Sequence, residues 1–304
     1  MKLSLWQNQT HKRFVSTPSM QPTIENLLSQ DQAVLVQNLE LDASEARIEV
    51  QMLLQRVLKV GRAYLFAHPE RILNKSEVHD YIELFERRRA GEPMAYLLGE
   101  REFFGLNLKV TSATLIPRPD TELLVEQVLE RIHIANSKIL DMGTGSGAIA
   151  LALAHQRSEV SVWACDASIA ALTVARENAK KLAINNVQFV ESNWFSALSG
   201  QHFDVIVSNP PYIAAEDIHL SQGDVRFEPL SALASGVDGL DDIRHIVQHA
   251  GAHLNEGGWL LLEHGYDQSE RVRELLIHAG FAEVFSARDL SDIERCSGGK
   301  LRAL

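Results

Sequence analysis

The spacing of apolar residues changes near position 102, and the two parts of the chain predict different classes of structure. In the first part, apolar residues recur every three or four positions, which is typical of amphipathic helices. Asp42 and Glu45 resemble a capping box that begins one helix, and Gly61 ends it. Ser76 caps a second helix, and Gly91 lies just beyond its last residue. This part therefore predicts a small bundle of helices.

Short extended stretches on either side of Gly105 predict a hairpin, and after it strands and helices alternate. Such alternation is typical of an α/β fold, in which a mostly parallel sheet has helices on both faces. The expected strands are 137–142, 160–165, 187–191, 203–207 and 259–263. The expected helices are 147–156, 169–182 and 268–279.

The length of 304 residues is about twice that of a usual domain, so two domains are expected. We expect a polar N-terminal extension, a helical domain, a hairpin linker and an α/β domain. Their expected bounds are 1–22, 23–95, 96–115 and 116–304.

The composition predicts a globular protein and excludes several other classes. Apolar residues make up 45% and charged residues 23%, which is typical of a chain with a packed core. No apolar run approaches the roughly 18 to 20 residues of a membrane-spanning helix. The polar first 20 residues do not resemble a secretory signal, and the two cysteines are too few for a disulfide framework. We therefore expect a protein of the reducing cytoplasm with no membrane partner.

The net charge of −11 is concentrated in the α/β part, where residues 101–304 hold 27 acidic residues against 17 Lys and Arg. Proteins that bind nucleic acid usually have a basic surface that displaces counterions from phosphates. Residues 213–242 are especially acidic, with seven acidic residues and one arginine. The charge therefore argues against direct nucleic-acid binding, and this segment favours a basic protein surface as partner.

A glycine-rich segment joins the strand expected at 137–142 to the next helix, with the sequence Gly143-Thr144-Gly145-Ser146-Gly147. Glycines there let the backbone turn tightly and approach a ligand closely, beside the amides at a helix start. Asp166 ends the next strand, where a carboxylate can bind ribose hydroxyls. Because Gly143, Gly145 and Ala148 also fit the G-x-G-x-x-A pattern of dinucleotide-binding proteins, the segment predicts a nucleoside-type cofactor without deciding which one.

A second motif, Asn209-Pro210-Pro211-Tyr212, follows the strand expected at 203–207. The two prolines remove two backbone N–H donors and fix the local φ angles. What remains is a pair of hydrogen-bond acceptors, the Asn209 side-chain oxygen and the Pro210 carbonyl, beside the ring of Tyr212. This set suits a planar –NH2 group, whose two N–H bonds meet the acceptors while the ring packs on its flat face.

The chemistry of such an amine explains the need for these acceptors. The lone pair of an amide or aromatic amine nitrogen is delocalised, so the nitrogen is a poor nucleophile. Hydrogen bonds from its protons to Asn209 and Pro210 favour a more localised lone pair aimed at an electrophile such as a methyl sulfonium. Since Asn is not a base, the expected catalysis is positioning and electrostatic polarisation. Hydride transfer from a nicotinamide has no use for this acceptor pair.

With these motifs the sequence resembles the class I S-adenosylmethionine-dependent methyltransferases. More narrowly, it resembles the HemK/PrmC family of protein-(glutamine-N5) methyltransferases, which act on peptide chain release factors. The signature of that family is similar to Leu115-Ile116-Pro117-Arg118-Pro119-Asp120-Thr121-Glu122, and segments 87–93 and 99–103 also resemble it. The resemblance covers about residues 23–304.

The resemblance implies a helical substrate-recognition domain, a hairpin linker and a seven-stranded, Rossmann-like methyltransferase domain. It implies methyl transfer from S-adenosyl-L-methionine to the glutamine side chain of the Gly-Gly-Gln motif in class I release factors, which modulates translation termination. By motif, the residues implied to contact the cofactor are Gly143, Thr144, Gly145, Ser146, Gly147, Asp166, Trp194 and Asn209. The glutamine is implied to bind Asn209, Pro210, Pro211 and Tyr212, of which Asn209, Pro210 and Tyr212 are the implied catalytic residues.

Two other functions remain as alternatives. An enzyme that methylates an exocyclic amine of a nucleic-acid base uses the same acceptor motif, although the acidic charge argues against it. A non-catalytic sensor of S-adenosylmethionine, or an assembly factor of the translation apparatus, has no need of that motif. His245, His249 and His253 are spaced by four residues opposite an apolar helix face, so we expect them in solvent and expect no metal. No long amphipathic stripe predicts an interface, so a monomer is expected.

Overall fold

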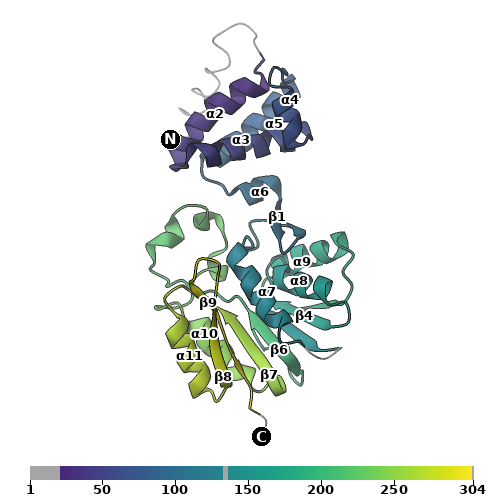
Figure 1. The fold of residues 1–304 in the computed structure, drawn as a ribbon, viewed down its shortest axis with the longest axis vertical. Coiled ribbons are helices and arrows are strands. Elements are labelled where there is room, and N and C mark those ends of the chain that lie inside the picture. The colour runs from purple at the N-terminus through teal and green to yellow at the C-terminus, as the bar shows by residue number, and fades with distance from the viewer. Residues whose placement is uncertain (1–20, 133–135, 303–304) are drawn as a thin grey trace. The chain divides into compact units, whose positions relative to one another are not determined.

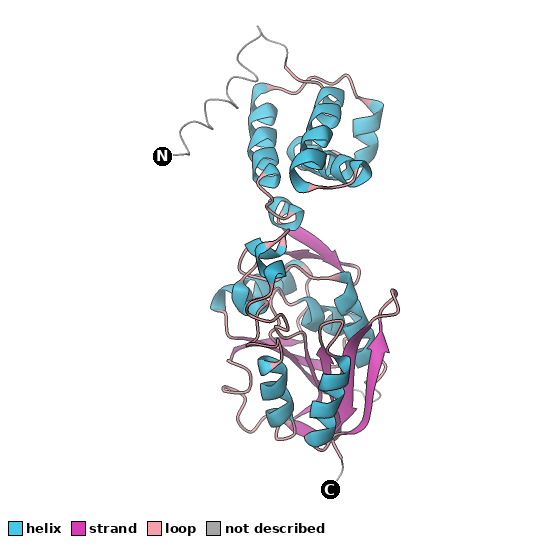
Figure 2. Cartoon of the chain, turned by 90° about the vertical axis from the view of Figure 1, so that its left-hand side faces the viewer, coloured by secondary structure: helices cyan, strands magenta, loops and turns pink. Residues whose placement is uncertain are grey.

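The structure is a computed structural model that describes residues 21–132 and 136–302. These residues form two compact units that divide between Leu98 and Gly99 (Figure 1). The first unit is built of helices, and the sheets lie in the second (Figure 2). Of the predicted extension 1–22, residues 1–20 lie outside the described part of the chain.

The first unit is a bundle of amphipathic helices around one apolar core, as the helical spacing of its apolar residues predicts. Leu35, Leu53 and Tyr81 are among its fully buried side chains, and the Tyr81 hydroxyl donates to Asp31 at 2.8 Å. The helices are α2 (Ile24–Leu39), α3 (Ala43–Leu58), α4 (Arg62–Ala67), α5 (Lys75–Arg89) and α6 (Met94–Leu98).

Two of the predicted helix ends are wrong. Gly61 does not end α3, because Lys59 does so in the left-handed conformation with φ of 56°, and Gly61 instead precedes α4. The cap of α5 is Asn74 rather than Ser76. The Asn74 side chain accepts the Glu77 N–H at 3.0 Å, and the Glu77 carboxylate accepts the Asn74 N–H at 2.9 Å. This reciprocal pair satisfies two backbone donors, which Ser76 alone does not do.

The basic run at the end of α5 is used within the bundle. Arg88 is buried and bonds the Glu49 carboxylate of α3 through Nε at 2.7 Å and Nη2 at 2.9 Å. Arg87 pairs with Glu92, and Arg89 pairs with Glu86. The run therefore forms ion pairs within the bundle.

The second unit begins with the predicted hairpin and continues as a seven-stranded sheet. The hairpin strands are β1 (Glu100–Phe103) and β2 (Leu106–Lys109). The sheet has the order β5-β4-β3-β6-β7-β9-β8, in which β9 runs antiparallel to both neighbours and the other pairs are parallel. Its strands are β3 (Lys138–Met142), β4 (Ser161–Asp166), β5 (Val187–Glu191), β6 (Phe203–Ser208), β7 (Leu254–Glu263), β8 (Ala282–Arg288) and β9 (Glu294–Lys300). The predicted α/β class with a mostly parallel sheet is confirmed.

Helices cover both faces of this sheet, and each face has its own apolar core (Figure 1). Successive strand residues point to opposite faces. Ile139 and Val205 therefore pack with α7 and α8, while Leu140 and Ile206 pack with α10 and α11. The helices are α7 (Glu122–Leu129), α8 (Ala148–Gln156), α9 (Ile169–Lys181), α10 (Asp241–Ala250) and α11 (Ser269–His278).

Strand β9 is inserted between β7 and β8, and its glycines permit the close fit. A side chain at Gly298 would clash with the Leu261 side chain and lie 2.8 Å from the Leu260 carbonyl oxygen. Strand β7 begins at Leu254, five residues before the predicted start. Leu254 pairs with Phe203 of β6, and after a register irregularity the pairing resumes between Trp259 and Val205. Among residues 21–132 and 136–302, no helix is both long and apolar enough to cross a bilayer.

Candidate active site

The carboxyl ends of four neighbouring strands bring the predicted site residues into one row. Cys165 of β4 and Ser208 of β6 both lie opposite Met142 of β3, and Leu262 of β7 lies opposite Ser208. The next residues, in order across the sheet, are Asp166, Gly143, Asn209 and Glu263. Because adjacent strands are about 4.8 Å apart, the glycine loop and the Asn209 motif begin side by side. The row spans the point between β3 and β6 where the strand order reverses, which is where open α/β sheets bind ligands.

Three backbone amides of the glycine loop are turned toward β4. The N–H groups of Gly143 and Thr144 both donate to the Cys165 carbonyl at 2.9 Å, and the Gly145 N–H donates to Asp166 Oδ2 at 2.9 Å. Gly143 and Gly145 have φ of 70° and 57°, which residues with a side chain rarely adopt. With these amides occupied, the loop has fewer donors for a pyrophosphate. The geometry disfavours the dinucleotide interpretation that the glycine spacing leaves open.

Asp166 and Trp194 both lie against the glycine loop. Asp166 Oδ1 accepts the Ser168 N–H at 2.8 Å, so each carboxylate oxygen has one amide donor and keeps a lone pair. Burial raises the pKa of Asp166, and the two amide donors oppose that shift. The Trp194 ring lies 3.8 Å from the position that a Cβ of Gly143 would take, and its Nε1 donates to Asp242 of α10 at 3.2 Å.

Asp141, the residue before Met142 in β3, is a buried carboxylate in which one oxygen lacks a hydrogen-bond partner among the described residues. Its Oδ2 accepts from the Thr144 hydroxyl at 2.6 Å and from the Ala150 N–H at 3.1 Å. Its Oδ1 has no partner among the described residues, and burial raises the pKa of the group to about 7. An unpartnered buried oxygen is costly, so this one points to a hydrogen-bond donor that a ligand would bring.

Asn209 and Tyr212 are held by residues outside their own segment. The Asn209 Nδ2 donates to the Thr121 hydroxyl at 3.1 Å, so the side-chain oxygen of Asn209 is the end of the amide left for a ligand. The Tyr212 hydroxyl donates to Glu263 Oε1 at 3.4 Å. Glu263 is 2% exposed, and burial raises its pKa to about 7. Pro210 is buried and Pro211 is half-buried between the two.

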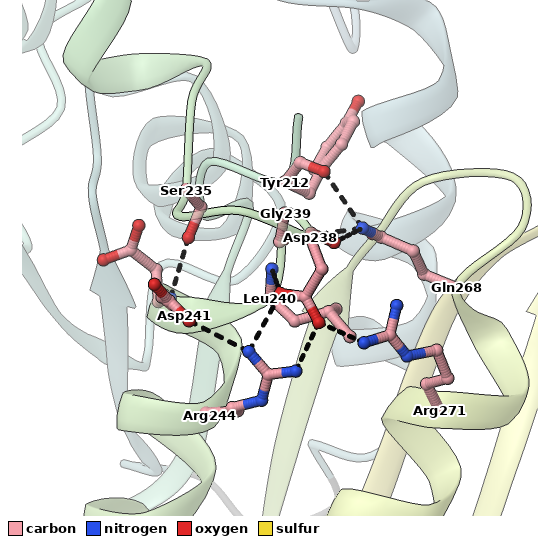
Figure 3. Close-up of polar contacts among 10 residues, drawn as sticks. Tyr212, Ser235, Asp238, Gly239, Leu240, Asp241, Arg244, Gln268 and Arg271 are labelled. Atoms are coloured by element: carbon pink, nitrogen blue, oxygen red, sulfur yellow. Dashed lines mark hydrogen bonds and ion pairs between the residues drawn. The ribbon is translucent and has the colours of Figure 1, made fainter. Parts of the chain in front are cut away.

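The backbone of Tyr212 is clamped by Gln268, at the start of α11 (Figure 3). Gln268 Nε2 donates to the Tyr212 carbonyl at 3.0 Å, and its Oε1 accepts the Gly265 N–H at 2.8 Å. Gly239 packs directly on that carbonyl, and any Cβ at this position would collide with it. The ring of Tyr212 extends away from the clamp in Figure 3. The clamp therefore fixes the backbone, while the hydroxyl of the ring is held by Glu263.

The turn that carries Gly239 is fixed by ion pairs around Asp238 (Figure 3). Arg244 of α10 and Arg271 of α11 both pair with Asp238, and Arg244 also bonds Asp241 at 2.9 Å. Hydrogen bonds from Arg244 and Arg271 hold the pKa of Asp238 well below its usual range. Part of the acidity of residues 213–242 is thus neutralised within the fold.

The family-like signature and this acidic segment meet at Glu228. Its carboxylate accepts from the Arg118 guanidinium and from the Ile116 N–H at 2.9 Å. The Glu228 side chain is fully buried, and burial raises its pKa although the ion pair with Arg118 opposes the shift. Through its ion pair with Glu228, Arg118 therefore connects the signature to residues 213–242.

The structure places every predicted cofactor and substrate residue at this edge of the sheet, whereas two residues that support them, Thr121 and Gln268, are absent from the prediction. Thr121 lies inside the signature, but its bond to Asn209 spans 88 positions of sequence. Glu263 is visible as the last residue of a strand, and Gln268 shows no signal in the sequence. The described residues contain no group of three side chains suited to bind a metal ion. Phe195 stacks on His253 at 4.6 Å, so this histidine is not simply in solvent as predicted.

Comparison with known families agrees with this geometry. The Methyltransferase small domain family matches residues 118–225, and the PrmC N-terminal domain family matches residues 36–99. A methyltransferase from Pyrococcus furiosus, known from a crystal structure, is similar with a TM-score of 0.51 and 20% identity. That match covers 66% of this chain and 91% of the other, and at this identity it shows the fold alone.

Two curated relatives are similar over nearly their whole length. The release factor glutamine methyltransferase of Salmonella typhimurium is 50% identical over 259 residues, which cover 85% of this chain and 94% of the relative. The protein of the same name from Escherichia coli is 49% identical over 262 residues, covering 86% and 95%. The chain therefore belongs to the release factor glutamine methyltransferase family.

Proposed function

We propose that this chain transfers the methyl group of S-adenosyl-L-methionine to the side-chain amide nitrogen of the glutamine in the Gly-Gly-Gln motif of class I release factors. The observation that carries the proposal is the row of strand ends, where the acceptor motif Asn209–Tyr212 starts beside the glycine loop. The relatives named release factor glutamine methyltransferase support the substrate class.

The residues of the glycine loop and its neighbours fit this cofactor. Asp166 has a lone pair on each oxygen for the two ribose hydroxyls, and the loop 143–147 brings backbone close to the ligand. The orphan Oδ1 of Asp141 suits the ammonium group of a methionine moiety, and Trp194 offers an apolar surface beside Gly143. When bound, S-adenosylmethionine supplies an electrophilic methyl group on a sulfonium sulfur.

The Asn209 motif receives the glutamine in this proposal. The Asn209 side-chain oxygen and the Pro210 carbonyl accept the two protons of the substrate amide, and Tyr212 packs on its plane. These bonds orient the nitrogen lone pair toward the glycine loop and reduce its delocalisation. No residue of the motif is a base at neutral pH, so its contribution is positioning and electrostatic polarisation, and the proton that the nitrogen loses on methylation leaves to water.

We assign recognition of the release factor to the helical domain at 23–95, joined through the linker 96–115 to the methyltransferase domain at 116–304. The match of a PrmC N-terminal domain to residues 36–99 supports this assignment. We propose further that the protein acts as a cytoplasmic monomer on release factors, without binding nucleic acid directly. By methylating the release factor, the protein modulates translation termination.

The test is transfer of a labelled methyl group from S-adenosylmethionine to a purified release factor. The same factor with its Gly-Gly-Gln glutamine replaced by alanine, total RNA and total DNA serve as parallel acceptors. We expect label in the intact factor alone. Asn209→Ala should reduce transfer by about 100-fold or more, because the substrate amide loses its main acceptor, while cofactor affinity measured by calorimetry changes little.

Other distributions of label would contradict the proposal. Label in RNA or DNA would favour the enzyme that methylates a base. Cofactor binding without transfer to any acceptor would favour the sensor.

A further inference from the structure

The sheet fixes only the beginning of the acceptor motif Asn209–Tyr212. Ser208, the last residue of β6, pairs with both neighbouring strands. Pro210 and Pro211 have no N–H group, so their backbone cannot donate a hydrogen bond that would hold the rest of the motif. The positions of the Pro210 carbonyl and the Tyr212 ring therefore depend on how the far end of the motif is held.

Gln268 holds that far end through an amide whose orientation is unambiguous. Its Nε2 donates to the Tyr212 carbonyl at 3.0 Å and lies 3.5 Å and 3.4 Å from the carbonyl oxygens of Asp238 and Gly239. Its Oε1 accepts the Gly265 N–H at 2.8 Å. A backbone carbonyl only accepts and a backbone N–H only donates, so the reversed amide would lose all of these bonds.

The peptide group that follows Tyr212 is held on both of its sides. Its carbonyl accepts from Gln268, and its N–H, which belongs to Ile213, donates to the Leu233 carbonyl at 2.9 Å. Gln268 is 6% exposed, so bulk water does not compete for the carbonyl from that side. The direction of this peptide group is therefore fixed by the fold.

Gly239 encloses the same carbonyl from a second direction. It has φ of 73°, and a Cβ at this position would lie 2.2 Å from the Tyr212 carbonyl oxygen. The turn of Gly239 is held in place by Asp238, which accepts from Arg244 of α10 at 2.9 Å and pairs with Arg271 of α11 (Figure 3). Since Gln268 directly precedes α11, the donor amide and the turn are supported by one helix.

We propose that Gln268 is a positioning residue that sets the Pro210 carbonyl and the Tyr212 ring for the substrate amide. The sheet holds the motif before Asn209, and Gln268 holds it after the ring. The two fixed proline φ angles limit the freedom of the backbone between these points. The acceptors thus keep a fixed spacing, on which catalysis by positioning depends. This inference rests on the proposed function, because it assigns these acceptors a substrate –NH2 group.

The first test replaces Gln268 with methionine, which has a similar length and no amide. We expect Gln268→Met to lower kcat for the release factor by about 10- to 100-fold, because small displacements of positioned groups slow the chemical step. Cofactor affinity, measured by calorimetry, should change little, since Gln268 bonds the substrate motif and not the glycine loop. Gln248→Met, at an exposed position of α10, is the control and should keep the wild-type kcat.

A second pair of variants displaces the same carbonyl without a change at Gln268. Gly239→Ala places a methyl group against the Tyr212 carbonyl, and we expect kcat to fall at least about 10-fold. Gly200→Ala is the matched control. Gly200 has nearly the same φ, 71°, but a Cβ there meets no atom within 4 Å. Both variants strain a left-handed backbone position, and only the first displaces the carbonyl.

A third readout needs neither cofactor nor substrate. Tyrosine is followed directly by isoleucine twice in the chain, at Tyr81 and Tyr212. Labelling tyrosine carbonyls with ¹³C and isoleucine nitrogens with ¹⁵N therefore selects two carbonyl signals in NMR, and Tyr212→Phe identifies one of them by its loss. We expect the Tyr212 signal to move upfield in Gln268→Met, because its carbonyl loses a hydrogen bond, while the Tyr81 signal stays in place.

Three results would overturn the inference: an unmoved Tyr212 signal in Gln268→Met, a wild-type kcat in that variant, or equal losses of kcat in the two glycine variants. Failure of the proposed function looks different. If the wild-type protein transfers no methyl group while the Tyr212 signal moves as expected, the proposed function fails and the hold of Gln268 on the motif stands.

Discussion

At the scale of single residues, Asp166 is the side chain on which cofactor recognition depends most in our proposal. The amides of Gly145 and Ser168 already hold its two oxygens. The carboxylate is therefore oriented before a ligand arrives, which lowers the entropic cost of binding. Its second lone pairs remain for two ribose hydroxyls.

We expect Asp166→Ala to weaken binding of S-adenosylmethionine by about 10- to 100-fold, because two charge-assisted hydrogen bonds are lost. Isothermal titration calorimetry measures the change directly. Asp80→Ala, at an exposed position of α5 in the helical unit, removes the same group as a control and should bind like the wild type. An unchanged affinity in Asp166→Ala would refute the role of this carboxylate.

The residues of the site were predictable to different degrees, for a physical reason. Gly143 and Asn209 each follow a strand and Asp166 ends one. Because parallel strands end at one edge, local pattern alone places these residues together. Thr121 and Gln268 act through contacts made only when distant segments pack, at separations of 88 and 56 positions. No periodicity in one sequence encodes such a contact.

At the scale of elements, helices α3 and α5 are joined by the buried pair of Glu49 and Arg88. A buried ion pair contributes little net stability, but loss of one partner leaves an uncompensated charge in the core. The pair thus fixes how the two helices meet.

Arg88→Met should therefore destabilise the helical unit by about 3 to 5 kcal/mol, because the buried Glu49 carboxylate loses its ion pair with Arg88. Chemical denaturation followed by circular dichroism measures this free energy. The double variant Glu49→Leu with Arg88→Met should recover most of the loss. Arg87→Met, which breaks a more exposed pair with Glu92, should cost less than about 1 kcal/mol. Equal losses in Arg88→Met and Arg87→Met would contradict this account.

The central strands and their helices were predictable, whereas α7, β8 and β9 are not among the expected elements, and the ends of elements were less predictable. The helix at the glycine loop and the parallel strands follow from period and turn chemistry. The end of α3 did not, because Lys59 adopts a left-handed conformation that usually favours glycine. The apolar pattern of the sequence also does not predict the position of β9 between β7 and β8, because strand order is set by packing of the whole sheet.

At the scale of the whole molecule, the edge of the sheet that forms the site carries a cost in stability. Burial raises the pKa of Glu263 from 4.5 to about 7 and that of Asp141 from 3.8 to about 7. Between the unfolded and folded pKa values, the folded protein binds more protons than the unfolded chain. The free energy of unfolding contributed by these groups therefore falls as pH rises toward about 7.

We expect Glu263→Gln to flatten this fall, because the amide has no proton to lose. Relative to wild type, the variant should gain at least about 1 kcal/mol in free energy of unfolding between pH 5 and pH 8. Denaturant titrations at both pH values give the difference in free energy of unfolding between the two proteins. The contributions of other acidic residues are the same in both proteins and cancel in this difference. A constant difference between the two proteins at pH 5 and pH 8 would show that Glu263 does not titrate in this range.

The insertion of β9 between β7 and β8 also determines the order in which the sheet can assemble during synthesis. Within residues 21–132 and 136–302, strand β8 pairs with β9 alone, and β9 follows it along the chain. Strand β8 and the free edge of β7 therefore stay unpaired until residues 294–300 have been synthesised and have paired with both. A chain interrupted before that point presents an unpaired, apolar strand edge, which is a template for aggregation. Incomplete copies of this protein would thus be prone to aggregate.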